Sequence, residues 1–271
     1  MVTSGTRVAP AYDRGVAILI DPPRPEAHGR RWSHLISDTS TEELHAFARA
    51  AGIPRRAFEG DHYDIPEERY AAVVAAGALE VSGRELLRSL TSAGLRMQKR
   101  LGDKGIARQL AVPLMSGAVA DVDLFASSRP MDERRVFAAM VFLRDAAGDL
   151  AVVHSDRRQE WGSPGGWREG SESVRDNAVR EVSEETGIDL RTDDLRPCGY
   201  ERFRPVSGTP FVPSGRDILQ AYVATVPLRR PSLSAQLDDT TDRRWVTPSE
   251  YGALCGHLFW WPLAQRALEL D

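Results

Sequence analysis

Apolar positions in the second half of the chain are grouped as expected for β-strands. Residues 135–143 form a long apolar run, and a polar turn over residues 145–149 separates it from a second apolar run at residues 150–153. This pattern predicts a β-hairpin. Downstream stretches rich in β-branched and aromatic residues predict further strands, and a final apolar stretch predicts a closing helix. The predicted strands span residues 198–204, 218–226 and 244–247, and the helix spans residues 258–270.

Helices and strands alternate in the first part of the chain. An apolar run at residues 15–20 predicts a buried strand, and polar residues over 24–38 and 60–66 predict loops. Helix start and stop signals predict the remaining elements, which are helices over residues 41–51, 67–76 and 82 toward 101, with a short strand at 77–81. This order predicts a small α/β domain over residues 1–101. Glycine and proline punctuate residues 102–130, which predicts a linker, and residues 131–271 form the second predicted domain.

The overall composition is that of a soluble globular protein. Of the 271 residues, 42% are hydrophobic and 27% are charged, and the net charge is −4. This charge implies no general attraction to nucleic acid, so we expect a small-molecule partner, with RNA caps as an alternative. Cys198 and Cys255 are far apart in the sequence, which fits a reduced, cytoplasmic setting. The chain has no long apolar span, so we expect no membrane segment. The sequence leaves open whether the protein forms a homodimer.

An acidic stretch over residues 166–188 is the most informative part of the sequence. Neither proline nor glycine interrupts it between Glu172 and Glu185, and Ser171 offers a capping hydroxyl, so we expect a helix. At about 100° per residue, Glu181, Glu184 and Glu185 share one face. Like charges at this spacing weaken a helix, and a bound Mg²⁺ would compensate for their repulsion. The alternative is an ordinary solvated acidic face.

The fixed spacing of this stretch resembles the Nudix box. Gly166 is followed after five residues by Glu172, and after seven more by Arg180-Glu181-Val182, with Glu184-Glu185 and Gly187-Ile188 completing the pattern. Pro164-Gly165 and Trp161 precede it, as in many family members. The resemblance implies a C-terminal α/β/α sandwich with a mixed sheet. It also implies hydrolysis of a diphosphate bond with Mg²⁺, for which Mn²⁺ is a possible substitute.

The resemblance assigns roles to individual residues. It implies that Glu181, Glu184 and Glu185 are catalytic metal ligands, that the carbonyl of Gly165 is a backbone ligand, and that Glu181 alternatively acts as a base. Glu172 and Arg180 are implied to form a structural pair. A later acid often completes the site in this family, and here Asp239 or Asp242 is the candidate, the alternative being solvated turn residues. Substrate binding is expected at Arg202 and Phe203, unless the first is a solvated arginine and the second a core aromatic.

These features predict a Mg²⁺-dependent pyrophosphohydrolase that acts on a nucleoside diphosphate linked to a group X, or on a nucleoside triphosphate. One alternative is a nucleotide-sensing module with a Nudix fold that serves the N-terminal domain. Another is an N-terminal nucleotide-processing enzyme whose product the Nudix half removes. Retention of every box glutamate favours catalysis.

Histidines and aspartates in the N-terminal loops form a second candidate site. These side chains are able to bind a metal or a phosphate together, although their spacing is not a tight ligand motif and ordinary loop hydrogen bonding is the alternative. The residues are Asp21, His28, His34, Asp38, His62 and Asp64. The Ile-Asp-Pro-Pro, Arg-Trp-Ser-His-Leu and Gly-Asp-His-Tyr-Asp segments resemble a bacterial N-terminal domain family of unknown function. That resemblance implies no particular activity.

Overall fold

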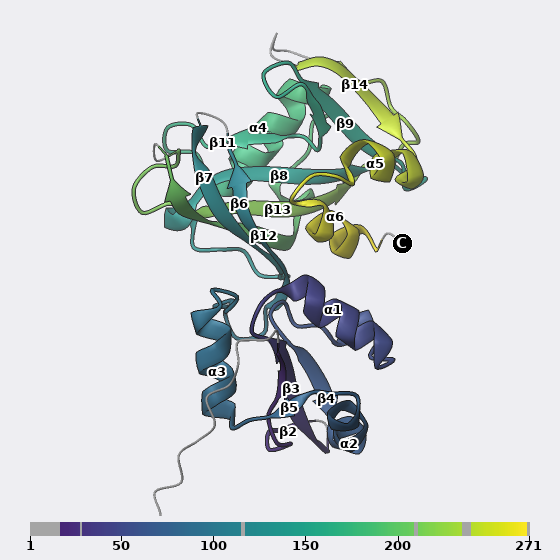
Figure 1. The fold of residues 1–271 in the computed structure, drawn as a ribbon. Coiled ribbons are helices and arrows are strands. Elements are labelled where there is room, and N and C mark those ends of the chain that lie inside the picture. The colour runs from purple at the N-terminus through teal and green to yellow at the C-terminus, as the bar shows by residue number, and fades with distance from the viewer. Residues whose placement is uncertain (1–16, 28, 115–116, 209–210, 235–239, 270–271) are drawn as a thin grey trace, which may run out of the picture. The chain divides into compact units, whose positions relative to one another are not determined.

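The structure is a computed structural model that describes residues 17–27, 29–114, 117–208, 211–234 and 240–269. Contacts divide the chain into two units, Met1–Arg96 and Met97–Asp271, and each is described by itself (Figure 1). Within the described residues, no helix has both the length and the apolar character needed to cross a membrane.

The N-terminal unit contains a five-stranded sheet with the order β2-β3-β1-β5, in which β4 also pairs with β3. Strands β1 and β5 are parallel, whereas β3 runs antiparallel to β1, β2 and β4. The strands are β1 (Ile18–Ile20), β2 (Glu26–Ala27), β3 (Arg30–Ser37), β4 (Tyr63–Pro66) and β5 (Leu79–Glu80). The helices are α1 (Thr41–Ala50), α2 (Glu67–Ala75) and α3 (Gly83–Ser92), with a 3-10 turn η1 (Arg55–Ala57).

Helices cover both faces of this sheet because its strands alternate between two cores. Ile18 and Ile20 of β1 belong to the core that contains residues of α1 and α2, whereas Leu19 belongs to the core that contains residues of α3. Successive side chains of a strand point to opposite faces, so one short apolar strand supplies both cores. The predicted α/β class of this region is confirmed.

The predicted loop over residues 24–38 is wrong, because residues Arg30–Ser37 form the central strand β3. The polar residues of β3 interrupt the apolar pattern that would otherwise have indicated a strand. Pairing with β1 on one side and β4 on the other buries Ser33 and Leu35 completely. The tertiary pairing therefore outweighs a weak local preference. Helix α3 also ends earlier than predicted, at Ser92, before the positive φ of Gly94.

The C-terminal unit is built on a nine-stranded mixed sheet with the order β10-β9-β8-β13-β12-β7-β6, to which β11 adds beside β8 and β14 beside β9. Among the described strands of this unit, the only parallel pair is β8 with β13. The strands are β6 (Lys104–Pro113), β7 (Val119–Ala126), β8 (Val136–Arg144), β9 (Leu150–Ser155), β10 (Glu160–Gly162), β11 (Gly165–Trp167), β12 (Arg196–Ser207), β13 (Ile218–Thr225) and β14 (Thr240–Val246). The helices are α4 (Val174–Thr186), α5 (Pro248–Cys255) and α6 (Trp261–Leu268), with 3-10 turns η3 (Glu133–Arg135) and η4 (Thr192–Asp194).

The predicted linker over residues 102–130 is wrong, because most of it forms strands β6 and β7 of this sheet. Strand β7 pairs with β12 along Val119–Ala126, and β6 pairs with β7. Glycine and proline lie at the ends of these strands or at their bulges, where they are tolerated. Arg108 of β6 and Asp123 of β7 form a buried ion pair, with 2.6 Å between Nε and Oδ1. These charged residues stand at positions where apolar residues would have indicated strands.

The sheet separates two cores, which is the α/β/α sandwich expected from the sequence. Met140 and Phe142 of β8 pack in the core that contains α5 and α6, whereas Ala139, Val141 and Leu143 pack in the core that contains α4. The continuous apolar run in β8 therefore reflects burial on both faces. Helix α5 had not been predicted from the sequence. It begins with a capping box in which Thr247 and Glu250 satisfy each other's backbone amides.

Helix α4 begins two residues later than the sequence indicated. Ser173, rather than Ser171, accepts the hydrogen bond from the amide of Asp176 and is the N-cap. The helix ends at Gly187, which has a φ of 69° and donates its amide to the carbonyl of Ser183. A left-handed glycine at this position is the usual way to end a helix, and Gly187 was predicted for that role.

Close packing at Gly199 provides a test of the central sheet. A Cβ at Gly199 would lie against the backbone oxygen of Phe125 on the neighbouring strand β7 and 2.6 Å from Cδ1 of Leu263 on α6. Because a backbone atom cannot move away easily, we expect Gly199→Ala to lower the free energy of unfolding by roughly 1–3 kcal/mol. Urea denaturation of the full chain measures this change.

Gly252→Ala is the matched control. Its Cβ would lie 3.6 Å from the ring of Trp261, which is an ordinary contact, and alanine favours the helix at this position. This variant should be as stable as the wild type or up to about 1 kcal/mol more stable. Equal stability of the two alanine variants would contradict the described packing of β12.

Candidate active site

The arginine of the acidic helix holds three glutamates in place. Nε and Nη2 of Arg180 bond to the two carboxylate oxygens of Glu172, at 3.1 and 3.0 Å, so this pair is bidentate. Nη1 of the same guanidinium lies 3.0 Å from Glu181 and 2.7 Å from Glu184. These contacts agree with the predicted pairing of Glu172 and Arg180. They also balance part of the repulsion between the acids of α4.

Glu181 is a largely buried acid of the helix, with a side chain that is 14% exposed. Burial raises the pKa of its carboxyl to about 7, with Arg180 opposing the shift and Glu184 adding to it. The carboxylate lies directly against Gly166, where any Cβ would overlap with it. A side chain at position 166 would therefore displace the Glu181 carboxylate from its present place.

Glu185 is bound to the loop that precedes the helix. Its Oε2 accepts a hydrogen bond of 2.9 Å from the backbone amide of Gly165, which opens strand β11. A Cβ at Gly165 would collide with the backbone of β8 at Ala139 and Met140. Both glycines thus let the main chain run tightly between β8 and the acidic face of α4.

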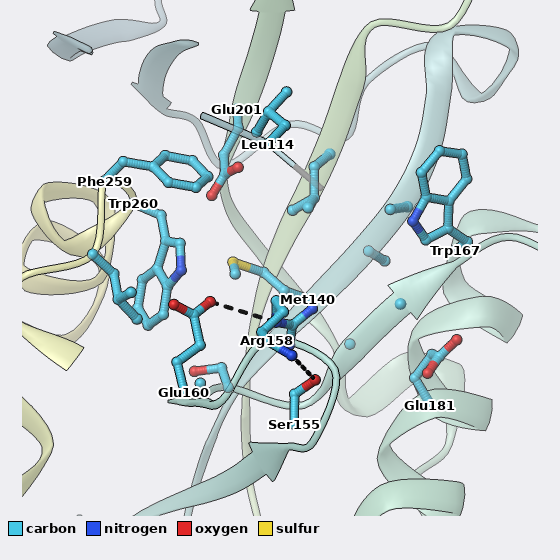
Figure 2. Close-up of a pocket in the computed structure, with 18 of the residues that line it drawn as sticks. Leu114, Met140, Ser155, Arg158, Glu160, Trp167, Glu181, Glu201, Phe259 and Trp260 are labelled. Atoms are coloured by element: carbon cyan, nitrogen blue, oxygen red, sulfur yellow. Dashed lines mark hydrogen bonds and ion pairs between the residues drawn. The ribbon is translucent and has the colours of Figure 1, made fainter. Parts of the chain in front are cut away.

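A cavity of about 480 Å³ borders these acids. Glu181, Glu185, Gly165 and Gly166 line part of it, and aromatic side chains line much of the remainder. The aromatic lining consists of Phe137, Trp161, Trp167, Phe203, Phe211, Phe259 and Trp260. Figure 2 shows Glu181 on α4 at one side, and Phe259, Trp260 and Glu201 at the other. This volume and this mixture of apolar walls with a few polar groups are typical of small-ligand sites.

Glu201 is a lining residue that the sequence did not reveal. It lies on β12, its exposed fraction is 0%, and neither carboxylate oxygen has a hydrogen-bond partner among the described residues. Burial raises the pKa of Glu201 to about 8. Buried acids without partners are rare because they lose the hydration of the carboxyl group. In the sequence, Glu201 is a single acid within a strand, and no spacing distinguishes it.

The two residues predicted to bind substrate lie on opposite faces of β12. Phe203 lines the cavity with Glu201, two positions before it on the same face. The side chain of Arg202 instead bonds to buried Asp123 at 2.7 Å and to the carbonyl of Gln98 at 2.5 Å. The geometry therefore contradicts the substrate role predicted for Arg202, because its guanidinium is used within the fold.

The predicted later acid is not seen at the cavity. Asp242 lies on β14 opposite His154 of β9, is exposed, and accepts a hydrogen bond from the amide of Arg243. It does not line the described cavity. Asp239 lies outside the described residues, so its predicted role stays a prediction.

Four of the predicted N-terminal residues are brought together. Asp21 and Asp64 contact His34 and His62, respectively, and the two rings lie 5.1 Å apart between their centroids. Burial lowers the pKa of His62, but hydrogen bonds to Asp61 and Asp64 outweigh this and raise it to about 9.

Asp38 does not join this group. It directly follows β3 and accepts a hydrogen bond from the amide of Ala17. His28 lies outside the described residues, so its predicted role stays a prediction. Asp61, which is not part of the predicted set, contacts His62 and belongs to the group.

Among the described residues, one group of three side chains has ligand atoms within 4.8 Å of one another, namely His34, His62 and Asp64. Glu181, Glu184 and Glu185 do not form such a group: Arg180 contacts Glu181 and Glu184, and Glu185 bonds to the amide of Gly165. Their predicted role as metal ligands stays a prediction.

The C-terminal unit is a mixed sheet between helices, and glutamates of one helix lie at the rim of an aromatic cavity. Residues 134–266 match the sequence model of the NUDIX domain, and residues 18–93 match that of a "Protein of unknown function (DUF4031)". The C-terminal half of the chain thus carries a Nudix domain, and both resemblances stated from the sequence are confirmed. No curated protein matches the sequence.

Solved structures of similar fold include several Nudix enzymes. Dihydroneopterin triphosphate pyrophosphohydrolase of E. coli is 21% identical, with a TM-score of 0.39 over 52% of this chain and 96% of that chain. A pyrophosphohydrolase of Bacillus subtilis is 22% identical, with a TM-score of 0.36 over 46% and 71%. The Ap4A hydrolase of C. elegans is 16% identical, with a TM-score of 0.36 over 47% and 92%. These scores are low, so the family assignment rests on the sequence match.

The buried carboxyl of Glu201 predicts a specific dependence of stability on pH. The native carboxyl keeps its proton up to about pH 8, whereas in the unfolded chain it loses the proton near 4.5. The native state binds more protons between these values, so this residue makes stability fall as the pH rises through the window. Glutamine cannot ionise. We therefore expect Glu201→Gln to melt with the wild type near about pH 5 and at a higher temperature near about pH 9.

Calorimetric or spectroscopic melting curves across this range measure the effect. Glu26→Gln, the same change at an exposed position of β2, should follow the wild type at every pH. A Glu201→Gln curve that is parallel to the wild-type curve would show that the carboxyl is not buried as described.

Proposed function

We propose that this protein is a Mg²⁺-dependent pyrophosphohydrolase that cleaves a diphosphate bond in a nucleotide-type substrate, either a nucleoside diphosphate linked to a group X or a nucleoside triphosphate. The observation that carries this proposal is the shared cavity. Glu181 and Glu185 of the Nudix box lie at the same opening as Phe203, Trp260 and other aromatic side chains. One pocket therefore offers carboxylates for a metal-bound diphosphate and apolar surfaces for a planar group.

The acids of α4 suit Mg²⁺ by their chemistry. Glu181, Glu184 and Glu185 offer only oxygen atoms, which are the ligands that Mg²⁺ prefers. Gly166 leaves space where a Cβ would displace the Glu181 carboxylate, so the backbone is shaped around this acid. When bound, Mg²⁺ would neutralise negative charge on the diphosphate and lower the pKa of a coordinated water.

The chain's own residues position these acids. Arg180 holds Glu172 against the start of the helix and is within reach of Glu181 and Glu184. The Gly165 amide fixes Glu185. Such prior positioning is the main contribution that a protein makes to phosphoryl transfer. Because Glu181 lines the cavity, either a metal-ligand or a base role fits its place.

Loss of a box acid should abolish hydrolysis without loss of the fold. A release assay of phosphate and nucleoside monophosphate, run with Mg²⁺ on a panel of nucleotides, identifies a substrate. On that substrate we expect Glu184→Gln and Glu185→Gln to lower kcat by roughly 100-fold or more, because each change removes a negative charge from the acidic face of α4 that is proposed to hold Mg²⁺.

Asp193→Asn is the control, since this exposed acid of η4 lies outside the cavity lining. It should retain the wild-type rate. Wild-type rates in the box variants on every substrate would refute the proposal. Tight nucleotide binding without any turnover in the wild type would instead support the sensing alternative.

A further inference from the structure

The histidine and aspartate cluster of the N-terminal unit is arranged by its strands. His34 of β3 and Asp64 of β4 are direct cross-strand partners, so both side chains lie on the same face of the sheet. His62 precedes Asp64 by two residues, and its Nε2 lies 3.3 Å from the Asp64 carboxylate. The intervening Tyr63 is buried in the core on the opposite side. Backbone pairing therefore creates the cluster.

Each histidine ring is oriented by a buried aspartate. Oδ1 of Asp21 accepts a hydrogen bond of 2.6 Å from the backbone amide of His34. Oδ2 of the same aspartate lies 3.1 Å from Nδ1 of His34. Asp61 lies 2.6 Å from Nδ1 of His62, and its other oxygen bonds to Arg96 at 3.1 Å. An aspartate on Nδ1 fixes the tautomer that presents Nε2 as a ligand. This is the usual arrangement around metal-binding histidines.

We propose that His34, His62 and Asp64 bind a divalent transition-metal ion, through Nε2 of both rings and one carboxylate oxygen, while Asp21 and Asp61 are positioning residues. Two imidazoles with one carboxylate suit ions such as Zn²⁺ or Fe²⁺ better than Mg²⁺. Three aspartates around the site favour a cation over a phosphate. The side chains of His34 and Asp64 are 34% and 39% exposed, so a bound ion would keep positions open to solvent or a ligand.

Zn²⁺ titration of the full chain tests this site. The background is Glu184→Gln with Glu185→Gln, which weakens the competing acids of the Nudix box. After removal of metals with a chelator, calorimetry should find one bound Zn²⁺ per chain. X-ray absorption of the bound Zn²⁺ should show imidazole ligands, which the box cannot supply.

Variants of the cluster separate ligands from positioning residues. Asp64→Asn and His34→Gln should abolish stoichiometric binding, and both positions are exposed enough for the fold to persist, which circular dichroism checks. Asp21→Asn should keep one site but weaken it by about 10–100-fold. Glu68→Gln, an exposed acid of α2 in the same unit, should bind as the parent does.

Two results would overturn the proposal. One is Zn²⁺ binding of unchanged strength in Asp64→Asn and His34→Gln. The other is an absorption spectrum without imidazole scattering. Either result would leave the cluster as an ion pair of protonated His62 with its aspartates.

A separate observation concerns the buried acid of the catalytic cavity. Glu201 combines complete burial, two oxygens that have no partner in the described chain, and a place in the cavity lining. A group of this kind is costly to stability unless a ligand satisfies it. Its neighbours Phe203 and Phe259 present apolar surfaces of the sort that stack on planar rings.

We infer that Glu201 determines specificity by hydrogen bonding to the edge of a purine base in this cavity. A carboxyl that keeps its proton has one donor and one acceptor, and it matches a base edge with an acceptor beside an N–H donor. This inference rests on the proposed function for the placement of the diphosphate. It does not require that hydrolysis occurs.

Calorimetric binding of ADP, GDP and ribose 5-phosphate to the full chain tests it. Glu201→Leu should weaken ADP or GDP binding by about 10-fold or more, because the base edge loses its partner, while ribose 5-phosphate binding stays unchanged. Glu201→Gln, which keeps a donor and an acceptor, should bind close to wild type.

Equal nucleotide affinity in the wild type and Glu201→Leu would refute the inference, and so would a wild type that binds neither ADP nor GDP. A loss of affinity in Glu201→Leu, in a protein that shows no turnover, would uphold this inference while the proposed function fails.

Discussion

Three carboxylates crowded near the end of one helix are the constraint on which the C-terminal domain depends. Glu181, Glu184 and Glu185 repel one another and also face the negative end of the α4 dipole, where acids are unfavourable. Arg180 and the amide of Gly165 offset part of this repulsion. A helix that needs such compensation is poorly explained by stability alone. It is well explained by a function that requires concentrated negative charge.

The same constraint explains the glycines before the helix. Helix α4 packs in one core of the sandwich, whereas Phe203 and Trp260 of the cavity belong to the other core. The acids reach the cavity past Gly165 and Gly166, where a side chain would collide with β8 or with Glu181 itself. Gly165 and Gly166 therefore lie between the acidic helix and the aromatic pocket. Because they have no side chains, they leave the space between the two open.

Local signals in the sequence predicted the parts of the fold that depend on local chemistry. The box spacing indicated α4 and its end at Gly187, and the apolar run indicated β8, because capping and two-sided burial leave direct traces in the sequence. Strands β6 and β3 were missed because their polar residues are satisfied by distant partners. Arg108 pairs with Asp123, and His34 pairs with Asp21. Each partner lies on another part of the chain, outside the few residues over which a strand pattern is recognised.

Site residues divide in the same way. Glu172 and Arg180 were identified because their spacing is fixed, whereas Glu201 was missed and Arg202 was misassigned because only the register of β12 decides which face each one takes. Adjacent residues on a strand point in opposite directions, so an error of one position exchanges a half-buried structural arginine for a cavity acid.

Ligand chemistry also distinguishes the two halves of the chain. The acids of α4 offer oxygen alone, whereas the N-terminal cluster adds two imidazoles whose Nδ1 atoms are already held by aspartates. The acids of α4 therefore suit a hard cation, whereas the N-terminal cluster suits a borderline one. Neither preference depends on how the two units are arranged, so each proposed site is argued from the residues of its own half. The proposed metal site of the N-terminal half therefore rests on its cluster alone, independently of the hydrolase.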